Sequence, residues 1–232
     1  MTSVRPVVVV VEDEPQIQRF LKTSLEANEF TVHQSATGKQ GLVECATRRP
    51  EVVILDLGLP DMDGIEFIRQ LREWSSVPVI VLSARSQEAD KIAALEAGAD
   101  DYVVKPFGVG ELIARMRVAL RHSATSDGDA AGVLRAGELE VDLVNRRVKR
   151  AGADVHLTPT EYRLLVVLVK YPGKVLTQRY LLKEVWGPGY VESAHYLRIY
   201  MANLRKKLEN DPAQPRHLLT ETGVGYRFDT AE

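Results

Sequence analysis

Five short apolar runs alternate with amphipathic segments over the first half of the chain, and this alternation constrains the fold more than any other feature of the sequence. Between the runs, residues such as Ile17, Leu21 and Leu25 recur at helical spacing. Strands that alternate with helices form a parallel sheet with right-handed crossovers. The sequence therefore predicts an α/β domain with a doubly wound, five-stranded parallel sheet. The predicted strands lie at residues 6–11, 30–34, 51–56, 77–83 and 101–105.

Polar groups stand at the carboxyl ends of four of these strands. Glu12 and Asp13 follow the first run, Asp56 ends the third, Ser83 ends the fourth and Lys105 ends the fifth. In open α/β sheets, ligands bind beyond the carboxyl ends of the strands, where the strand order reverses. We therefore expect these five side chains to converge on one edge of the sheet.

Three carboxylates and an ammonium group at one edge suit phosphoryl transfer. Crowded acids repel one another unless a cation relieves them, and carboxylate oxygens with room for water describe a Mg²⁺ site. An aspartate can form an acyl phosphate, so Asp56 is the candidate phosphoacceptor. Lys105 and the metal would neutralise the oxygens of the transferred group.

Each of these residues also has a simpler explanation. An acid after a strand is often a helix cap, Ser83 could cap a helix that starts near Gln87, and Lys105 could be a solvated loop residue. Their joint occurrence at four strand ends favours the phosphoryl-transfer site. A hydrolase with an Asp-x-Asp nucleophile pair would need an acid where Gly58 stands, and no glycine-rich phosphate loop followed by lysine indicates ATP binding.

The second half of the chain has a different pattern. Residues 134–159 show short alternating runs that are separated by turn residues, which indicates a small antiparallel sheet. Thr158, Pro159 and Glu161 form the start signal of one helix, and Thr177 that of another. The longest predicted helix spans residues 192–210, and a hairpin follows around Gly223. Three helices followed by a hairpin predict a winged helix-turn-helix.

The predicted long helix has a polar face opposite its leucines. Arginine and asparagine can hydrogen-bond to base edges, and lysine and arginine neutralise phosphates. A merely solvated face is the alternative, and the helix order with the hairpin favours binding of double-stranded DNA. The predicted DNA contacts are His195, Arg198, Asn203, Arg205 and Lys206 of this helix, with Thr222 and Arg227 of the hairpin.

Charge and composition separate the two halves. Residues 1–122 carry 14 Lys/Arg and 18 Asp/Glu, whereas residues 133–232 carry 16 and 12. The stretch between them, "SATSDGDAAG", is small and polar, as linkers are. We therefore predict domains at 1–122 and 133–232 with a linker at 123–132. The single Cys45 suits a reducing cytoplasm, and "PVVVVV" is too short to span a bilayer, so no membrane contact is expected.

The first half resembles the receiver domain of bacterial two-component response regulators. The resemblance rests on "VEDE", "LDLGLPDMDG", "VLSAR" and "AGADDYVVKPF". It implies Asp56 as the phosphoacceptor, and Glu12, Asp13 and Asp56 with the backbone oxygen of Gly58 as ligands of Mg²⁺. It further implies that Ser83 and Lys105 bind the phosphoryl oxygens, that Tyr102 is the aromatic switch partner of Ser83, and that the Lys105–Pro106 bond is cis.

The second half resembles the winged-helix effector of the OmpR/PhoB family through "LTPTEYRLL", "VLTQRYLLKEVWG", "NLRKKLE" and "TETGVGYRF". Thr222 replaces an arginine that many relatives carry before the first wing glycine, and Ala202 and Asn203 replace paired arginines. The resemblance therefore extends to DNA binding but not to the target sequence. Within the family, "HYLRIYMANLRKKLE" and "FIRQLREWSSVPVIVLSARS" are most similar to regulators of potassium-transport genes.

The resemblance also implies a sensor histidine kinase as phosphodonor, a homodimer on phosphorylation and a contact of residues 186–193 with RNA polymerase. Two alternatives remain open: a constitutive DNA-binding regulator with an inert receiver, and a metal-dependent phosphatase. The complete acid–Ser–Lys set argues against the first alternative, since an inert receiver has no need of all of it. A phosphorylation-switched regulator that is not an enzyme is favoured. The implied dimer contacts pair Lys91 with Glu111, Asp101 with Arg115, and Asp100 with His122.

Overall fold

The computed structural model describes residues 5–124 and 132–230, and side chains at 121–124 are not described. The chain divides into two compact units, Met1–Ser123 and Ala124–Glu232, which we describe separately. Residues 125–131 of the predicted linker lie outside the described residues.

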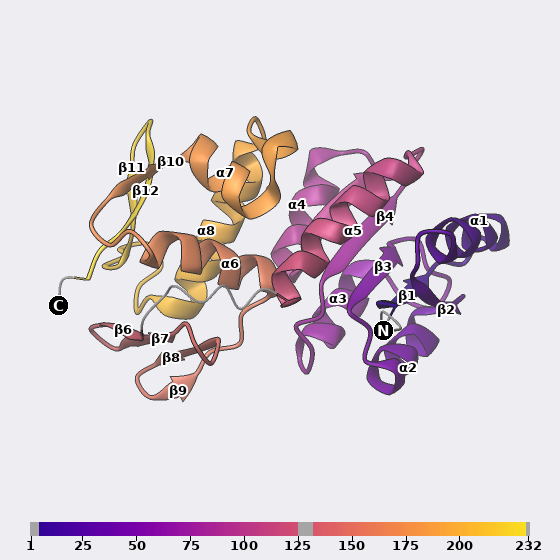
Figure 1. Ribbon diagram of the computed structural model, residues 1–232, viewed down its shortest axis with the longest axis horizontal. Helices are drawn as coiled ribbons and strands as arrows, with labels where there is room; N and C mark the ends of the chain where they lie inside the picture. Colours follow the sequence, from indigo (N-terminus) through magenta and orange to yellow (C-terminus); the bar gives the residue numbers. More distant parts are fainter. Residues whose placement is uncertain (1–4, 125–131, 231–232) are drawn as a thin grey trace. The chain divides into compact units, whose positions relative to one another are not determined.

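The first unit contains one five-stranded sheet in which all strands are parallel (Figure 1). Its order is β2-β1-β3-β4-β5, so the predicted doubly wound sheet is confirmed. The order reverses between β1 and β3, because the chain passes outward to β2 before it returns to the other side of β1. The strands are β1 (Val7–Val11), β2 (Thr31–Ser35), β3 (Val52–Asp56), β4 (Val79–Ser83) and β5 (Asp101–Val104).

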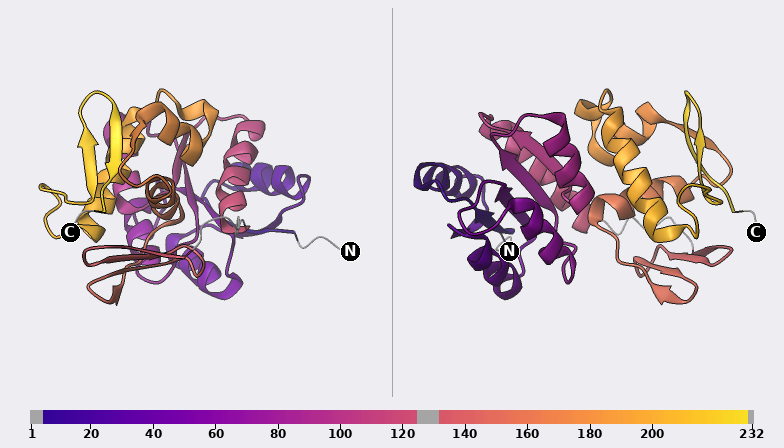
Figure 2. Two further views of the ribbon diagram at one scale, coloured as in Figure 1. Left: turned by 60° about the vertical axis from the view of Figure 1, so that its left-hand side comes forward. Right: turned by 180° about the vertical axis from the view of Figure 1, so that it is seen from behind.

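Helices cover both faces of this sheet (Figure 2). Leu21 and Leu25 of α1 pack with Leu112 and Met116 of α5 against one face. The other face is covered closely by α2, since a Cβ atom on Gly41 would come within 2.7 Å of Val11. The helices are α1 (Pro15–Glu26), α2 (Gly38–Arg48), α3 (Gly64–Arg72), α4 (Glu88–Ala97) and α5 (Val109–Ala124).

The burial of β3 explains how one acid is held at the edge of the sheet. All five residues of β3 are buried, and its last residue, Asp56, is 8% exposed. Because Val53 and Leu55 pair in register with both neighbouring strands, the packing behind Asp56 fixes its backbone. The strand thus delivers Asp56 to the point where the strand order reverses.

The second unit begins with a four-stranded antiparallel sheet of order β6-β7-β8-β9. Three helices follow, and the predicted capping box of the first is present: Thr158 accepts from the backbone of Glu161, and Glu161 accepts from that of Thr158. The elements are β6 (Val133–Ala136), β7 (Leu139–Asp142), β8 (Arg147–Arg150), β9 (Ala153–Asp154), α6 (Pro159–Val169), α7 (Gln178–Trp186), a 3-10 turn η1 (Pro188–Tyr190) and α8 (Ala194–Leu208).

The predicted hairpin is confirmed, and it gains a third strand that the sequence did not reveal. β11 (Leu218–Glu221) pairs with β12 (Gly225–Phe228), and β10 (Val175–Thr177) pairs with the other edge of β12. A Cβ atom on Gly225 would lie 1.9 Å from the carbonyl oxygen of Leu176. Glycine at this position therefore allows β10 to approach. Among the described residues, no helix has the length and apolar character that crossing a membrane requires.

Candidate functional site

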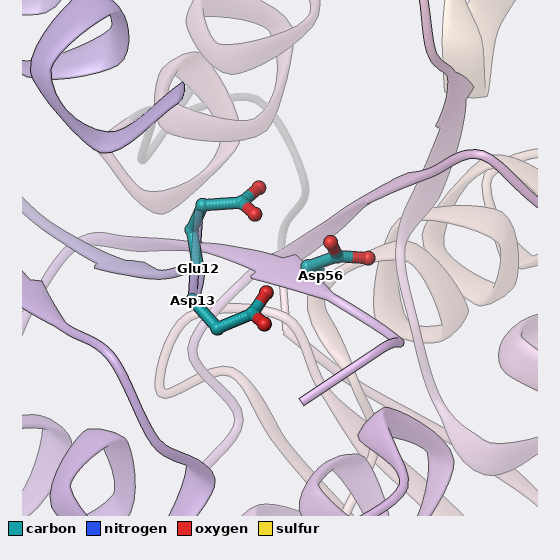
Figure 3. Close-up of side chains that lie close together, drawn as sticks. All are labelled: Glu12, Asp13 and Asp56. Carbon is teal, nitrogen blue, oxygen red and sulfur yellow. The ribbon is translucent and has the colours of Figure 1, made fainter. Parts of the chain in front are cut away.

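Three carboxylates meet at the carboxyl edge of the parallel sheet. Glu12 and Asp13 follow β1, Asp56 ends β3, and one oxygen of each lies within 4.8 Å of the others. Figure 3 shows the side chains of Glu12, Asp13 and Asp56 close together. Glu12 is 1% exposed, whereas Asp13 is half-buried. Only oxygen ligands are offered here, which is the donor set that Mg²⁺ prefers.

Lys105 joins this cluster from the loop after β5. Its Nζ lies 2.7 Å from Oδ2 of Asp56 and 2.8 Å from Oε2 of Glu12. Burial acts to lower the pKa of Lys105, but its hydrogen bonds with Asp56 and Glu12, together with the negative charges of these acids, raise it. Lys105 is therefore held as an ammonium ion between two acids, and the alternative of a solvated loop lysine is wrong.

Burial of Glu12 disfavours the charged form of its carboxyl group. Desolvation raises the pKa of the Glu12 carboxyl, the charge of Asp56 raises it further, and the hydrogen bond from Lys105 opposes both effects. A cation beside Glu12 and Asp56 would relieve the same repulsion. The site is thus arranged to gain from additional positive charge.

None of the predicted site acids serves as a helix cap. Glu14 stands at the N-cap of α1 without a side-chain bond, and Asp63 caps α3 by accepting from Ile65 N at 2.8 Å. Asp56 accepts instead from the backbone N–H of Gly58 at 3.2 Å, inside the loop that follows it. The capping explanation is therefore wrong for Glu12, Asp13 and Asp56.

Ser83 and Tyr102 lie beside this cluster on β4 and β5. Ser83 is 2% exposed and Tyr102 is 4% exposed. The Tyr102 hydroxyl donates to the carbonyl of Arg85 at 2.7 Å, and Ser83 Oγ accepts from the N–H of Arg85 at 3.1 Å. Burial raises the pKa of Tyr102, and a hydrogen bond with Ser83 opposes that rise. Ser83 does not cap α4, whose N-cap is Gln87.

Two acids of the loop after β3 were not singled out from the sequence. Asp61 accepts from the N–H groups of Gly38 and Lys39 at 2.7 and 3.0 Å, and these hydrogen bonds lower its pKa. Asp63 caps α3 and pairs with Arg85 at 3.2 Å. The position of Asp63 before Gly64 is a detectable capping signal, but the partner of Asp61 lies 23 residues away and leaves no local pattern.

The Lys105–Pro106 bond is cis, as expected.

The predicted dimer residues make contacts within their own domain. Arg115 lies 2.9 Å from Asp101 and 2.6 Å from Glu111, so both acids have an intramolecular partner. Asp100 is 5% exposed and pairs with Arg72 at 3.0 Å, so its carboxylate is turned inward. Lys91 is half-buried on α4. The side chain of His122 lies outside the described residues.

In the second unit, the outward face of α8 is narrower than the sequence suggested. Arg198, Ala202 and Lys206 are exposed, whereas His195 is half-buried. These three exposed positions recur every four residues, which places them on one helical face. Thr222 is exposed at the tip of the hairpin.

Three predicted DNA contacts are buried or bonded within the second unit. Asn203 is 7% exposed, so its placement on the outward face was wrong. Arg205 donates two hydrogen bonds to the carbonyl of Leu218 at 2.8 and 2.6 Å and one to Thr220 at 2.7 Å, which holds α8 against β11. Arg227 pairs with Glu221 at 3.0 Å across the hairpin. The guanidinium groups of Arg205 and Arg227 therefore stabilise the wing, which is the hairpin of β11 and β12.

Comparison with known families agrees with this division. Residues 8–117 match the response regulator receiver domain, and residues 152–228 match the C-terminal domain of transcriptional regulatory proteins. The chain is 63% identical to the KDP operon transcriptional regulatory protein KdpE of Escherichia coli over 95% of its length and 98% of the relative.

The chain belongs to the OmpR/PhoB family of response regulators. Identity to KdpE of Mycobacterium tuberculosis is 50%, over 96% of this chain and 98% of that protein. The KdpE proteins of both organisms are transcriptional regulators and not enzymes, in agreement with the sequence prediction.

Solved structures support the same family. The OmpR/PhoB homologue DrrB of Thermotoga maritima is 32% identical, with a TM-score of 0.51 over 96% of this chain and 98% of that one. A mutant of RitR shares the fold with a TM-score of 0.80 at 24% identity, over 96% of this response regulator and 98% of that chain. The predicted receiver followed by a winged helix is therefore confirmed.

Proposed function

We propose that this KdpE-like regulator is activated when Asp56 accepts a phosphoryl group from a sensor histidine kinase. A carboxylate oxygen of Asp56 forms a bond to phosphorus while the bond from phosphorus to the imidazole nitrogen breaks, and the nitrogen keeps the electron pair. The observation that carries this proposal is the direct contact of Lys105 with both Asp56 and Glu12. A cation fixed beside the acceptor oxygen can neutralise charge on the incoming phosphoryl group.

Glu12, Asp13 and Asp56, with the backbone oxygen of Gly58, are the proposed ligands of Mg²⁺. Receiver domains bind Mg²⁺ at such an acidic site, and the three carboxylates here offer suitable oxygens within 4.8 Å of one another. When bound, the ion supplies positive charge that the phosphoryl oxygens need. Ser83 and Lys105 are proposed to hold the remaining oxygens, and Tyr102 to respond to the movement of Ser83.

The proposed response is a population shift toward a dimer. The surface formed by α4, β5 and α5 is proposed as the interface, with Lys91, Glu111, Asp101 and Arg115 as its charged groups. Asp101 and Arg115 would then exchange an intramolecular pair for an intermolecular one, which limits the gain in free energy to a small amount. Phosphorylation, rather than these pairs alone, must favour association.

For DNA, we propose that α8 enters the major groove with Arg198 directed at base edges. Arg198 is an exposed residue in the first half of the helix that can donate two parallel hydrogen bonds, which is the contact that selects guanine. Lys206 and His195 are proposed to contact phosphates, and Thr222 to approach the minor groove. The targets are proposed to be potassium-transport genes of the Kdp type, because the chain is similar to KdpE.

The cellular setting follows from the same proposal. A regulator that is phosphorylated by a kinase and binds promoter DNA works in the cytoplasm. Residues 186–193 are proposed to contact RNA polymerase. The domain limits proposed from the sequence, 1–122 and 133–232, leave a linker at 123–132 that lets two winged helices bind neighbouring half-sites.

The direct test replaces the acceptor. Asp56→Ala should abolish labelling by acetyl phosphate and should remove the effect of acetyl phosphate on dimerisation and DNA binding. Glu66→Gln, an exposed change on α3, serves as the matched control and should retain both. Release of many phosphates per Asp56 would instead support a phosphatase, and operator binding independent of Mg²⁺ and phosphate would support a constitutive regulator.

A further inference from the structure

Arg85 of the loop between β4 and α4 contacts both proposed switch residues. Its backbone N–H donates to Ser83 Oγ at 3.1 Å, and its carbonyl oxygen accepts from the Tyr102 hydroxyl at 2.7 Å. The position of this one peptide segment is therefore linked to the position of both side chains. A force that holds Arg85 in place also favours the buried orientation of Tyr102.

The guanidinium group of Arg85 supplies such a force. Its Nη1 and Nη2 atoms lie 3.3 and 3.2 Å from Oδ2 of Asp63. Asp63 itself is fixed, because its Oδ1 accepts from the N–H of Ile65 and caps α3. The two carboxylate oxygens of Asp63 thus serve different elements: one holds the start of α3, and the other holds the loop after β4.

We propose that Arg85 is a positioning residue of the phosphorylation switch, which acts through its ion pair with Asp63. The pair connects the loop that follows Asp56 to the loop that follows Ser83, and it stabilises the conformation in which Tyr102 is buried. This deepens the proposed function, since that conformation is the one that favours the dimer. The effect on Tyr102 itself requires no phosphate.

The strength of the pair suits a reversible switch. The side chains of Arg85 and Asp63 are 41% and 46% exposed, so solvent screens their attraction. Exposed pairs of this kind alter an equilibrium by no more than about fivefold. Such a bias can set the resting population of Tyr102 without preventing the change that phosphorylation causes.

A double-mutant cycle in the full-length protein tests the proposal. Asp63→Asn keeps an oxygen that can cap α3 but removes the charge, and Arg85→Gln removes the partner. The third variant combines both changes. Arg69→Gln is the matched control, because Arg69 is an exposed arginine of α3 with a distant partner, Glu66 at 3.9 Å. A cooperative urea transition in each of the four variants would establish that all of them fold.

The first measurement uses unphosphorylated protein that contains fluorotyrosine. The fluorine resonance of Tyr102, assigned with Tyr102→Phe, should become more accessible to a soluble paramagnetic probe in Asp63→Asn and in Arg85→Gln. The double variant should change no more than either single one, and Arg69→Gln should not change. Additive effects, or no effect on Tyr102, would overturn the positioning role.

The second measurement follows dimerisation by sedimentation at equal phosphorylation with acetyl phosphate. The dissociation constant should rise by up to about fivefold in both single variants, with no further rise in the double variant. If Tyr102 responds and the dimer does not, the positioning role stands and the proposed link from Tyr102 to dimerisation is overturned. Failure of Asp56→Ala to abolish activation would count separately against the proposed function.

Discussion

At the scale of single residues, Lys105 is the basic group that offsets the charge of the acidic site. Its ammonium group contacts Asp56 and Glu12, so one basic group faces an excess of acidic ones. Burial of Glu12 makes that excess costly, as the raised pKa of its carboxyl indicates. A divalent cation should therefore stabilise the folded receiver, and removal of Lys105 should increase the affinity for the cation.

Addition of Mg²⁺ should raise the free energy of unfolding of the receiver. At a free concentration ten times the dissociation constant, the expected gain is about 1.4 kcal/mol. Thermal unfolding with Mg²⁺ or with a chelator measures this gain. Asp13→Asn should reduce the gain in free energy of unfolding, because Asp13 is a proposed ligand. Lys105→Ala should produce the gain at a lower Mg²⁺ concentration. An equal response of Asp13→Asn and the unchanged protein would contradict the proposed ligand set.

At the scale of elements, the sequence predicted what local pattern determines. The β3 run, the capping box of α6 and the hairpin around Gly223 each have a signature of a few residues, and the structure confirms all three. Contacts between distant segments leave no such signature. The pairing of Asp100 with Arg72 spans 28 residues, and β10 has only three residues that form a strand because β12 lies beside them.

The same limit explains the error on α8. Helical periodicity places Ala202 and Asn203 on adjacent positions near the border of the buried face, and only the packed helices decide which of them is exposed. Arg205 looks like a DNA contact in the sequence, yet the carbonyl of Leu218 that it binds belongs to a strand 13 residues away. The location of the acidic site was predictable, because the carboxyl ends of parallel strands lie at the same edge of the sheet.

Substitutions on α8 should separate base reading from phosphate contact. Arg198→Ala should weaken operator binding by about 1–3 kcal/mol and relax the preference at one G·C pair. Lys206→Ala should weaken binding to all sequences alike and lower the slope of affinity against salt concentration by about 1. Titration of the operator and of single-base variants at several salt concentrations measures both effects.

Asn203→Ala tests a buried position on the same helix, α8. Because Asn203 is 7% exposed, its removal should lower the free energy of unfolding by about 1 kcal/mol and leave base preference unchanged. A change in base preference without a change in stability would place Asn203 at the DNA.

The wing offers a test of close packing. Gly225→Ala should lower the free energy of unfolding by more than about 2 kcal/mol, since the added methyl group meets the backbone of Leu176. Val224→Ala, at an exposed neighbouring position, should change it by less than about 0.5 kcal/mol. Urea unfolding compares the two, and equal effects would show that β10 can move away at little cost.

At the scale of the whole molecule, the proposed activation depends on having a receiver and a winged helix in one chain. Phosphorylation should strengthen binding to an operator with two half-sites, because the dimer makes the second contact intramolecular. Binding to one isolated half-site should change little. Titrations of both DNA fragments with and without acetyl phosphate measure this contrast. Equal strengthening on the single half-site would point to a change within the winged helix.

The narrow outward face of α8 has a consequence for genome-wide selection. Four-residue spacing separates Arg198 from Ala202 by about 6 Å along the helix, so one monomer can inspect only a few neighbouring base pairs. Such a short element occurs by chance at very many chromosomal positions. In the proposed dimer, two half-sites at a fixed spacing lengthen the recognised sequence, and the spacing itself adds discrimination.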